Sequence, residues 1–151
     1  MAFPVSIKGV LITDGRVVLL QNEREEWELP GGRLEAGEDP PVCLAREIEE
    51  ELATQAIVGP IIDCWLYEVL PGREVVIVTY GIERFGNAPF RVSHEHKRVG
   101  LFAVDELDGL KIPEGYRKSI RTWTARVARA VEVSAYAMIA TKLSSGSAFD
   151  G

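Results

Sequence analysis

Hydrophobic and polar positions follow a strand-type pattern in the first and middle parts of the chain and a helical spacing in two other segments. Thr13-Asp14-Gly15 and Pro71-Gly72 each separate two runs rich in Val, Ile and Leu, which is the pattern of a β-hairpin. The predicted strands are residues 5–12, 16–21, 56–69, 74–85 and 99–104. A polar loop is expected at 86–96 and one helical turn at 105–110.

The first helical segment begins after Asp39, a residue type that caps helices, and Pro40, which suits the first helical position. At about 100° per residue, one arc of this helix is apolar and is expected to face the core. The apolar arc consists of Leu44, Ala45, Ile48 and Leu52.

Three carboxylates, Glu47, Glu50 and Glu51, share a second arc of the same helix, whereas Arg46 and Glu49 are expected to point elsewhere. Crowded like charges cost helix stability unless something neutralises them, and a hard divalent cation such as Mg²⁺ does so. From this helix alone, a metal site and a solvated acidic surface are equally good interpretations.

The second helical segment starts near Pro113 and fills the last third of the chain. Its apolar stripe is Tyr116, Ile120, Trp123, Val127 and Val131. Arg and Lys residues lie mostly off the stripe, so we favour a core-packing helix with a solvated basic back over a phosphate- or RNA-binding helix. Residues 133–143 are apolar enough to suggest a partner surface, and 144–151 are predicted to be a disordered tail.

Length and charge fit one globular domain, which we place at residues 1–143. The chain has 151 residues and a net charge of −6, and such a charge argues against broad binding to nucleic acid. No apolar run approaches the roughly 20 residues that span a membrane, and no signal-peptide pattern is present. Cys43 and Cys64 lack a metal-binding spacing, so we expect reduced thiols in a cytoplasmic protein.

The loop before the acidic helix favours a metal site over a solvated acidic surface. Residues 27–32 read Trp-Glu-Leu-Pro-Gly-Gly, and the segment from Gly32 to Glu51 resembles the signature of the Nudix hydrolases, the MutT-like family. The positions in register are Gly32, Glu38, Arg46, Glu47, Ile48, Glu50 and Glu51. The match departs where the signature has glycine and an apolar residue, because this chain has Ala53 and Thr54. The glycine normally serves the helix exit, so Ala53 puts that exit in doubt.

The resemblance implies an α/β fold, a Nudix-type α/β/α sandwich with a mixed β-sheet and a loop–helix–loop signature. It implies hydrolysis of a nucleoside diphosphate linked to another group, by attack of water on phosphorus. It also implies Mg²⁺, or Mn²⁺, held by Glu47, Glu50, Glu51 and the carbonyl of Gly32. Arg46 and Glu38 are then expected to orient these carboxylates.

Further residues are candidates for the general base and for substrate binding. The general base is expected to be a signature glutamate, Glu47 or Glu50, or an acidic residue on a later loop, for which Glu95 is the candidate. His94 and His96 flank Glu95 and are more simply read as surface residues. Trp27, next to the glycine loop, and Arg33 are the candidates for substrate binding.

Two functions from different classes remain open at this point. The first is the pyrophosphohydrolase, with a nucleotide-type small molecule as substrate. The second is a non-catalytic Nudix-like domain that binds a nucleotide as a sensor or interaction module. The retention of every signature carboxylate favours the enzyme. A third hypothesis is removal of diphosphate from RNA ends, but the net negative charge of the chain disfavours RNA binding. A homodimer, through the C-terminal helix or the sheet edges, is compatible with the sequence.

Overall fold

The strands of the protein form two sheets, between and around which the helices pack. The structure is a computed structural model and describes residues 3–86, 89–91 and 98–146. Within these ranges no helix is long and apolar enough to cross a membrane.

The first sheet is mixed and has the strand order β5-β1-β7-β6. These strands are β5 (Gly31–Arg33), β1 (Val5–Val10), β7 (Arg73–Phe85) and β6 (Ala56–Leu70). Strand β1 is parallel to β7 and antiparallel to β5, and β6 pairs antiparallel with β7. The second sheet is antiparallel and consists of β2 (Ile12–Thr13), β3 (Arg16–Gln21), β4 (Trp27–Glu28) and β8 (Arg98–Ala103).

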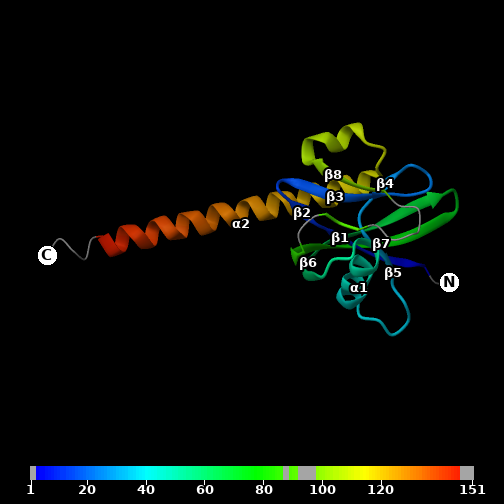
Figure 1. The fold of residues 1–151 in the computed structure, drawn as a ribbon, viewed down its shortest axis with the longest axis horizontal. Helices are drawn as coiled ribbons and strands as arrows, with labels where there is room; N and C mark the ends of the chain where they lie inside the picture. Colours follow the sequence, from blue (N-terminus) through cyan, green and yellow to red (C-terminus); the bar gives the residue numbers. More distant parts are fainter. Residues whose placement is uncertain (1–2, 87–88, 92–97, 147–151) are drawn as a thin grey trace.

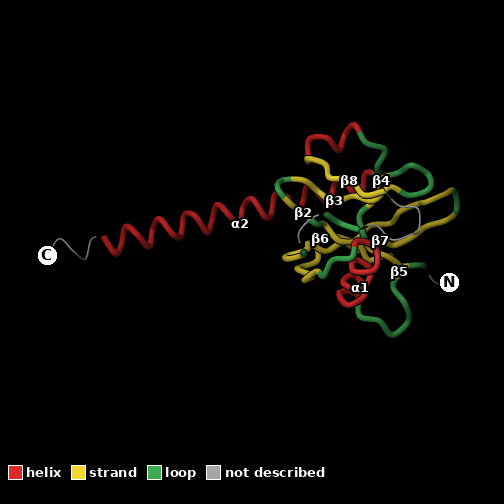
Figure 2. Tube along the Cα trace, viewed as in Figure 1, coloured by secondary structure: helices red, strands yellow, loops and turns green. Residues whose placement is uncertain are grey.

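Helices cover both faces of the mixed sheet, as Figures 1 and 2 show. Helix α1 (Pro40–Leu52) packs on the face that presents Ile7 and Ile82, and helix α2 (Glu114–Gly146) packs on the face that presents Val10 and Ile77. The two sets alternate along their strands because successive side chains point to opposite faces. A short 3-10 helix, η1 (Val104–Gly109), precedes α2. The expected α/β/α class is therefore confirmed.

Both predicted hairpins are present, although one has a shorter arm than expected. Asp14 and Gly15 have φ of 50° and 73°, and Gly72 has φ of 80°, as tight turns require. The prediction of one strand over residues 5–12 was wrong. It divides into β1, which joins the mixed sheet, and β2, which alone forms the hairpin with β3. Pairing between β1 and β7, which are far apart in sequence, causes this division.

The C-terminal helix is longer than the sequence predicted. Residues 144–146, expected to begin a disordered tail, still belong to α2, and the remainder of the expected tail lies outside the described residues. The first turns of α2 pack on the sheet, where Trp123 lies against the backbone of Gly81. From residue 125 to residue 145 every side chain is exposed.

Candidate active site

Helix α1 is anchored so that its polar face meets the glycine loop. Asp39 has extended backbone angles at the N-cap position, and Pro40 is the first helical residue, as expected. The carbonyl of Asp39 accepts a hydrogen bond from the Cys43 amide, but its side chain makes no capping hydrogen bond, contrary to our expectation. Leu44 and Ile48 are fully buried and hold the helix against the sheet.

The buried arc of α1 differs from the predicted one at two positions. Ala45 is only partly buried, whereas Cys43 is fully buried and belongs to the core below the helix. Burial raises the pKa of the Cys43 thiol to about 11. The helix ends at Ala53, which has φ of 53° and donates its amide hydrogen to the carbonyl of Glu49. The left-handed exit is thus kept without the usual glycine.

The glycine loop approaches α1 so closely that only glycine fits. Gly31 has φ of 142°, and a Cβ there would lie 2.0 Å from the carbonyl oxygen of Ile7. A Cβ on Gly32 would lie 2.3 Å from the carboxylate carbon of Glu47. The Glu47 carboxylate is therefore packed directly against the backbone of β5.

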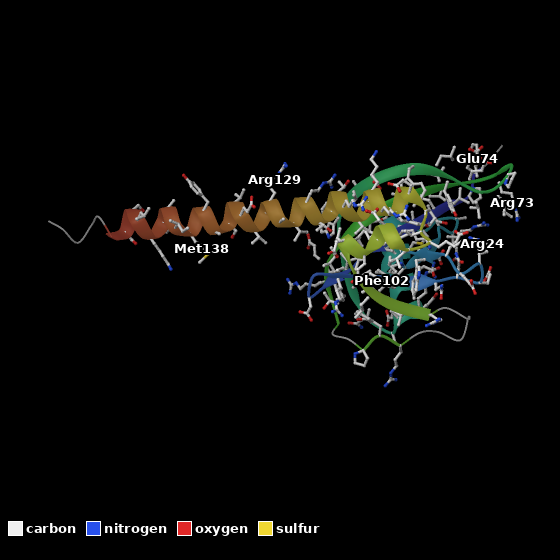
Figure 3. All side chains as sticks on the ribbon, turned by 90° about the horizontal axis from the view of Figure 1, so that it is seen from above. Arg24, Arg73, Glu74, Phe102, Arg129 and Met138 are labelled. Carbon is white, nitrogen blue, oxygen red and sulfur yellow. The ribbon has the colours of Figure 1, made fainter. Side chains whose placement is uncertain are left out.

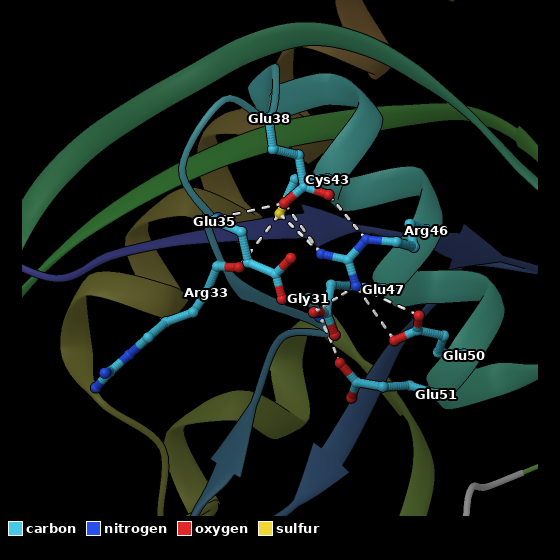
Figure 4. A network of polar contacts seen from close by, with 9 residues as sticks. All are labelled: Gly31, Arg33, Glu35, Glu38, Cys43, Arg46, Glu47, Glu50 and Glu51. Carbon is cyan, nitrogen blue, oxygen red and sulfur yellow. Dashed lines mark hydrogen bonds and ion pairs between the residues drawn. The ribbon is translucent and has the colours of Figure 1, made fainter.

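The other two carboxylates lie beside the same loop at different depths. Glu51 is buried, and one of its oxygens accepts a hydrogen bond of 3.1 Å from the Gly31 amide. Glu50 is exposed to solvent. A buried, an intermediate and an exposed carboxylate thus line the contact between α1 and β5, as the close-up in Figure 4 shows.

Arg46 hydrogen-bonds to three carboxylates around this face of the helix. Its guanidinium donates to both oxygens of Glu38, at 2.8 and 3.0 Å, and also to Glu47 at 3.2 Å and Glu50 at 3.3 Å. The expectation that Arg46 points away from the carboxylates was wrong, because its long side chain bends back across them (Figure 4). The hydrogen bond from Arg46 lowers the pKa of Glu38 from 4.5 to about 2, and the same contact raises the pKa of Arg46.

The donor set suits a hard divalent cation. Carboxylate and carbonyl oxygens are the ligands that Mg²⁺ prefers, and no described histidine or thiol competes among Glu47, Glu50 and Glu51. In residues 3–86, 89–91 and 98–146, no three acidic, His or Cys side chains already converge as a metal cluster. The Arg46 guanidinium occupies the space between Glu47 and Glu50 and supplies the positive charge there.

The two candidate substrate residues lie in different surroundings. Trp27 is partly buried, and its ring packs edge-to-face on Phe102 with centroids 4.8 Å apart. Arg33 is exposed and points away from the carboxylates (Figure 4). Glu95, His94 and His96 lie outside the described residues.

Arg33 lines a cavity of about 630 Å³ that also receives Arg24 and Arg73. Phe3 and Val75 contribute apolar surface to the same cavity, and Glu74 contributes a carboxylate. Figure 3 shows Arg24 and Arg73 at the end of the body remote from the projecting helix. Sequence reasoning missed Arg24 and Arg73, because they are isolated arginines near two separate turns. Only the fold places them beside Arg33.

Comparison with known proteins supports one family. The family model described as NUDIX domain matches residues 3–124. The 8-oxo-(d)GTP phosphatase of Mycolicibacterium smegmatis is 31% identical over 103 residues, which cover 68% of this chain and 31% of that protein. The CTP pyrophosphohydrolase of Escherichia coli is 28% identical over 66% of this chain and 76% of that protein. The chain thus spans less than a third of the M. smegmatis protein.

Solved structures show the same fold. The E. coli ORF135 protein superimposes with a TM-score of 0.70 at 24% identity, covering 85% of this chain and 94% of that one. A MutT NUDIX hydrolase from Burkholderia pseudomallei gives a TM-score of 0.71 at 24% identity, covering 81% and 98%.

Proposed function

The chain belongs to the NUDIX domain family, and on that basis we propose that it is a Mg²⁺-dependent pyrophosphohydrolase acting on a nucleotide-type substrate. The reaction is attack of water on phosphorus, which splits the phosphoric anhydride of a nucleoside diphosphate linked to another group. The observation that carries the proposal is that Glu47 and Glu51 lie against the glycine loop, with the exposed Glu50 beside them on the same helix and bound to Arg46.

Each carboxylate has a distinct position from which to act. Glu51 is fixed by the Gly31 amide, Glu47 is packed on Gly32, and Glu50 reaches solvent, where a substrate phosphate arrives. These three side chains and the Gly32 carbonyl would hold Mg²⁺, or Mn²⁺ in its place. When bound, the cation neutralises charge on the phosphates and acidifies water.

The remaining roles belong to the residues around the carboxylates. Arg46, itself held by Glu38, fixes the orientations of Glu47 and Glu50, and such outer support keeps ligands in productive geometry. A carboxylate oxygen takes the proton from the attacking water. Glu47 and Glu50 are the candidates within the described residues, and Glu95 is the candidate on the later loop.

Recognition of the substrate is assigned to the arginine-lined cavity and to Trp27. Guanidinium groups bind phosphate oxygens in bidentate fashion, so Arg24, Arg33 and Arg73 would hold an anionic part of the substrate. Arg24 also contacts Glu26 at 3.4 Å, so Arg33 and Arg73 are the more available of the three. The partly buried Trp27 would contact the base.

The relatives suggest which nucleotides to test first. Proteins that resemble this chain are described as acting on 8-oxo-(d)GTP and CTP, and an RNA pyrophosphohydrolase of Rhodospirillum rubrum is 34% identical over 64 residues. Nucleoside triphosphates, including an oxidised guanine nucleotide, are therefore the first class, ahead of dinucleoside polyphosphates, ADP-ribose and nucleotide sugars.

The test is phosphate or pyrophosphate release from this panel with and without Mg²⁺. We expect cation-dependent turnover of one class. Glu50→Gln should abolish that turnover with little change in melting temperature, because it removes a ligand and relieves like-charge crowding. Glu49→Gln, an exposed neighbour on the same helix, is the matched control and should retain activity.

The alternative function, a nucleotide-binding sensor, predicts a different result. Silence across the panel together with saturable nucleotide binding would favour the sensor. Full activity in Glu50→Gln would instead remove the metal assignment while leaving hydrolysis intact.

A further inference from the structure

The loop between β3 and β4 is held in place around Arg24. The side-chain oxygen of Asn22 accepts hydrogen bonds from the amides of Arg24 and Glu26, at 2.9 and 3.1 Å. The Lys111 ammonium, from the segment that precedes α2, donates to the carbonyl of Arg24 at 2.9 Å. Asn side chains that bind the backbone in this way fix the conformation of a turn, so the Arg24 side chain leaves the loop from a defined position.

The Arg24 side chain is in turn held by a carboxylate. Its Nε atom lies 3.4 Å from one oxygen of Glu26, and the other oxygen of Glu26 accepts a hydrogen bond of 3.1 Å from the Tyr67 hydroxyl. Tyr67 belongs to β6, so this hydrogen bond joins the loop to the mixed sheet. Partial burial and the Glu26 charge raise the pKa of Tyr67, against a smaller opposite effect of Arg24, so the hydroxyl keeps its proton and donates at neutral pH.

The three residues connect two cavities. Glu26 and Tyr67 line a cavity of about 400 Å³. Arg24 lines the arginine-lined cavity described above, together with Arg33 and Arg73 (Figure 3). Tyr67 therefore acts on the arginine-lined cavity from outside it, through Glu26 and Arg24.

Arg24 differs from the other two arginines in being fixed before any anion arrives. Within residues 3–86, 89–91 and 98–146, Arg33 and Arg73 form no ion pair, so each must be ordered when it binds. A guanidinium has five N–H donors, and Glu26 takes the one on Nε. Donors on the two terminal nitrogens of Arg24 remain for an anion.

From this arrangement, we propose that Arg24 is the pre-oriented anion-binding residue of the arginine-lined cavity and that Glu26 and Tyr67 are the positioning residues that hold it. This role rests on the function proposed above, because the anion is a phosphate group of the nucleotide. A guanidinium that is fixed beforehand loses less conformational freedom on binding than a free one. Glu26 and Tyr67 therefore strengthen substrate binding and leave the chemical step unchanged.

The first experiment is calorimetric titration of inorganic tripolyphosphate into the full chain without Mg²⁺. Under this condition the carboxylates on α1 repel the anion, so the titration reports the arginine-lined cavity. Tyr67→Phe removes only a hydroxyl and should weaken binding about three- to tenfold, the usual effect of losing one hydrogen bond. Glu26→Gln should weaken it as well. Tyr80→Phe, at a partly buried tyrosine packed on the α1 side of the mixed sheet, is the control and should bind normally.

A double-mutant cycle separates positioning from a merely structural role. Arg24→Gln alone should weaken binding, and adding Tyr67→Phe to it should cause no further loss, because Tyr67 acts through Arg24. A structural role of Tyr67 would weaken binding equally in both backgrounds. With a nucleotide that the chain hydrolyses, Tyr67→Phe and Glu26→Gln should raise KM and leave kcat unchanged.

Several results would overturn the proposal. One is independent, additive losses in Tyr67→Phe and Arg24→Gln, and another is an unchanged chain that does not bind tripolyphosphate. Unchanged or tighter binding in Glu26→Gln would mean that this carboxylate competes with the anion for Arg24. If nucleotides are still hydrolysed in these cases, the proposed function stands without this inference. Coupled losses in a chain that hydrolyses no nucleotide would instead support the positioning of Arg24 and remove the hydrolase.

Discussion

Arg46 and Glu38 form a bidentate ion pair, with N···O distances of 2.8 and 3.0 Å, across the start of helix α1. The pair fixes the guanidinium so that its third nitrogen, Nη1, faces Glu47 and Glu50. One arginine therefore links the loop that precedes the helix to two proposed metal ligands on it. The planar fork of arginine is essential to this geometry, because lysine is a point charge that cannot serve both sides.

We expect Arg46→Lys to weaken Mg²⁺ binding by about 10- to 100-fold, the usual effect of losing support behind metal ligands. Calorimetric titration of Mg²⁺ into the protein measures this directly, without any substrate. Arg16→Lys, at the exposed first residue of β3, is the control and should bind Mg²⁺ as the unchanged chain does. Equal affinity in both variants would show that Arg46 does not orient the ligands.

The lowered pKa of Glu38 predicts a specific dependence of stability on pH. The carboxyl titrates near 4.5 when unfolded and near 2 when folded, so its contribution is fully present above pH 4.5. That contribution is lost as the pH falls from 4.5 towards 2. The melting temperature of Glu38→Gln should therefore lie below that of the unchanged chain at pH 7, and the gap should close within this window. A gap that stays constant down to pH 2, or a like gap in Glu49→Gln, would contradict the pairing.

Ile48→Ala should destabilise the protein by about 2–4 kcal/mol, because it leaves a cavity where a fully buried side chain holds α1 to the sheet. Urea unfolding measures the change. Val42→Ala, on an exposed position of the same helix, should change the free energy of unfolding by less than about 0.5 kcal/mol. Similar effects at the two sites would mean that the packed face of α1 is assigned wrongly.

Ala53→Gly should stabilise the protein by about 0.5–1 kcal/mol, because a left-handed backbone is strained for alanine and free of strain for glycine. The same substitution inside the helix, Ala45→Gly, should destabilise by about 1 kcal/mol. The two substitutions should therefore shift the melting temperature in opposite directions, which thermal unfolding measures. Destabilisation by Ala53→Gly would exclude a left-handed exit.

Local sequence was sufficient for the elements that depend on neighbours along the chain. Helix α1 and the shared arc of Glu47, Glu50 and Glu51 follow from helical periodicity, and its start after Asp39 follows from Pro40, although the Asp39 side chain makes no capping hydrogen bond. Both hairpin turns follow from Asp14-Gly15 and Pro71-Gly72, whose residues favour the required backbone angles. The resemblance then identified the family, which the NUDIX match over residues 3–124 confirms.

Tertiary structure decided everything that joins distant segments. The pairing of β1 with β7 divided an expected strand, and contact between the glycine loop and α1 gave Glu51 its hydrogen bond from Gly31. Arg24, Arg33 and Arg73 line one cavity only because the fold brings three separate segments of the chain together there. Likewise, the apolar stripe of α2 predicts core packing as far as Val131, but every side chain from residue 125 to residue 145 is exposed, although Arg126 still hydrogen-bonds to the sheet. The spacing of apolar residues along a chain shows which side chains share one face of a helix or strand. Which part of the protein covers that face depends on how the rest of the chain folds.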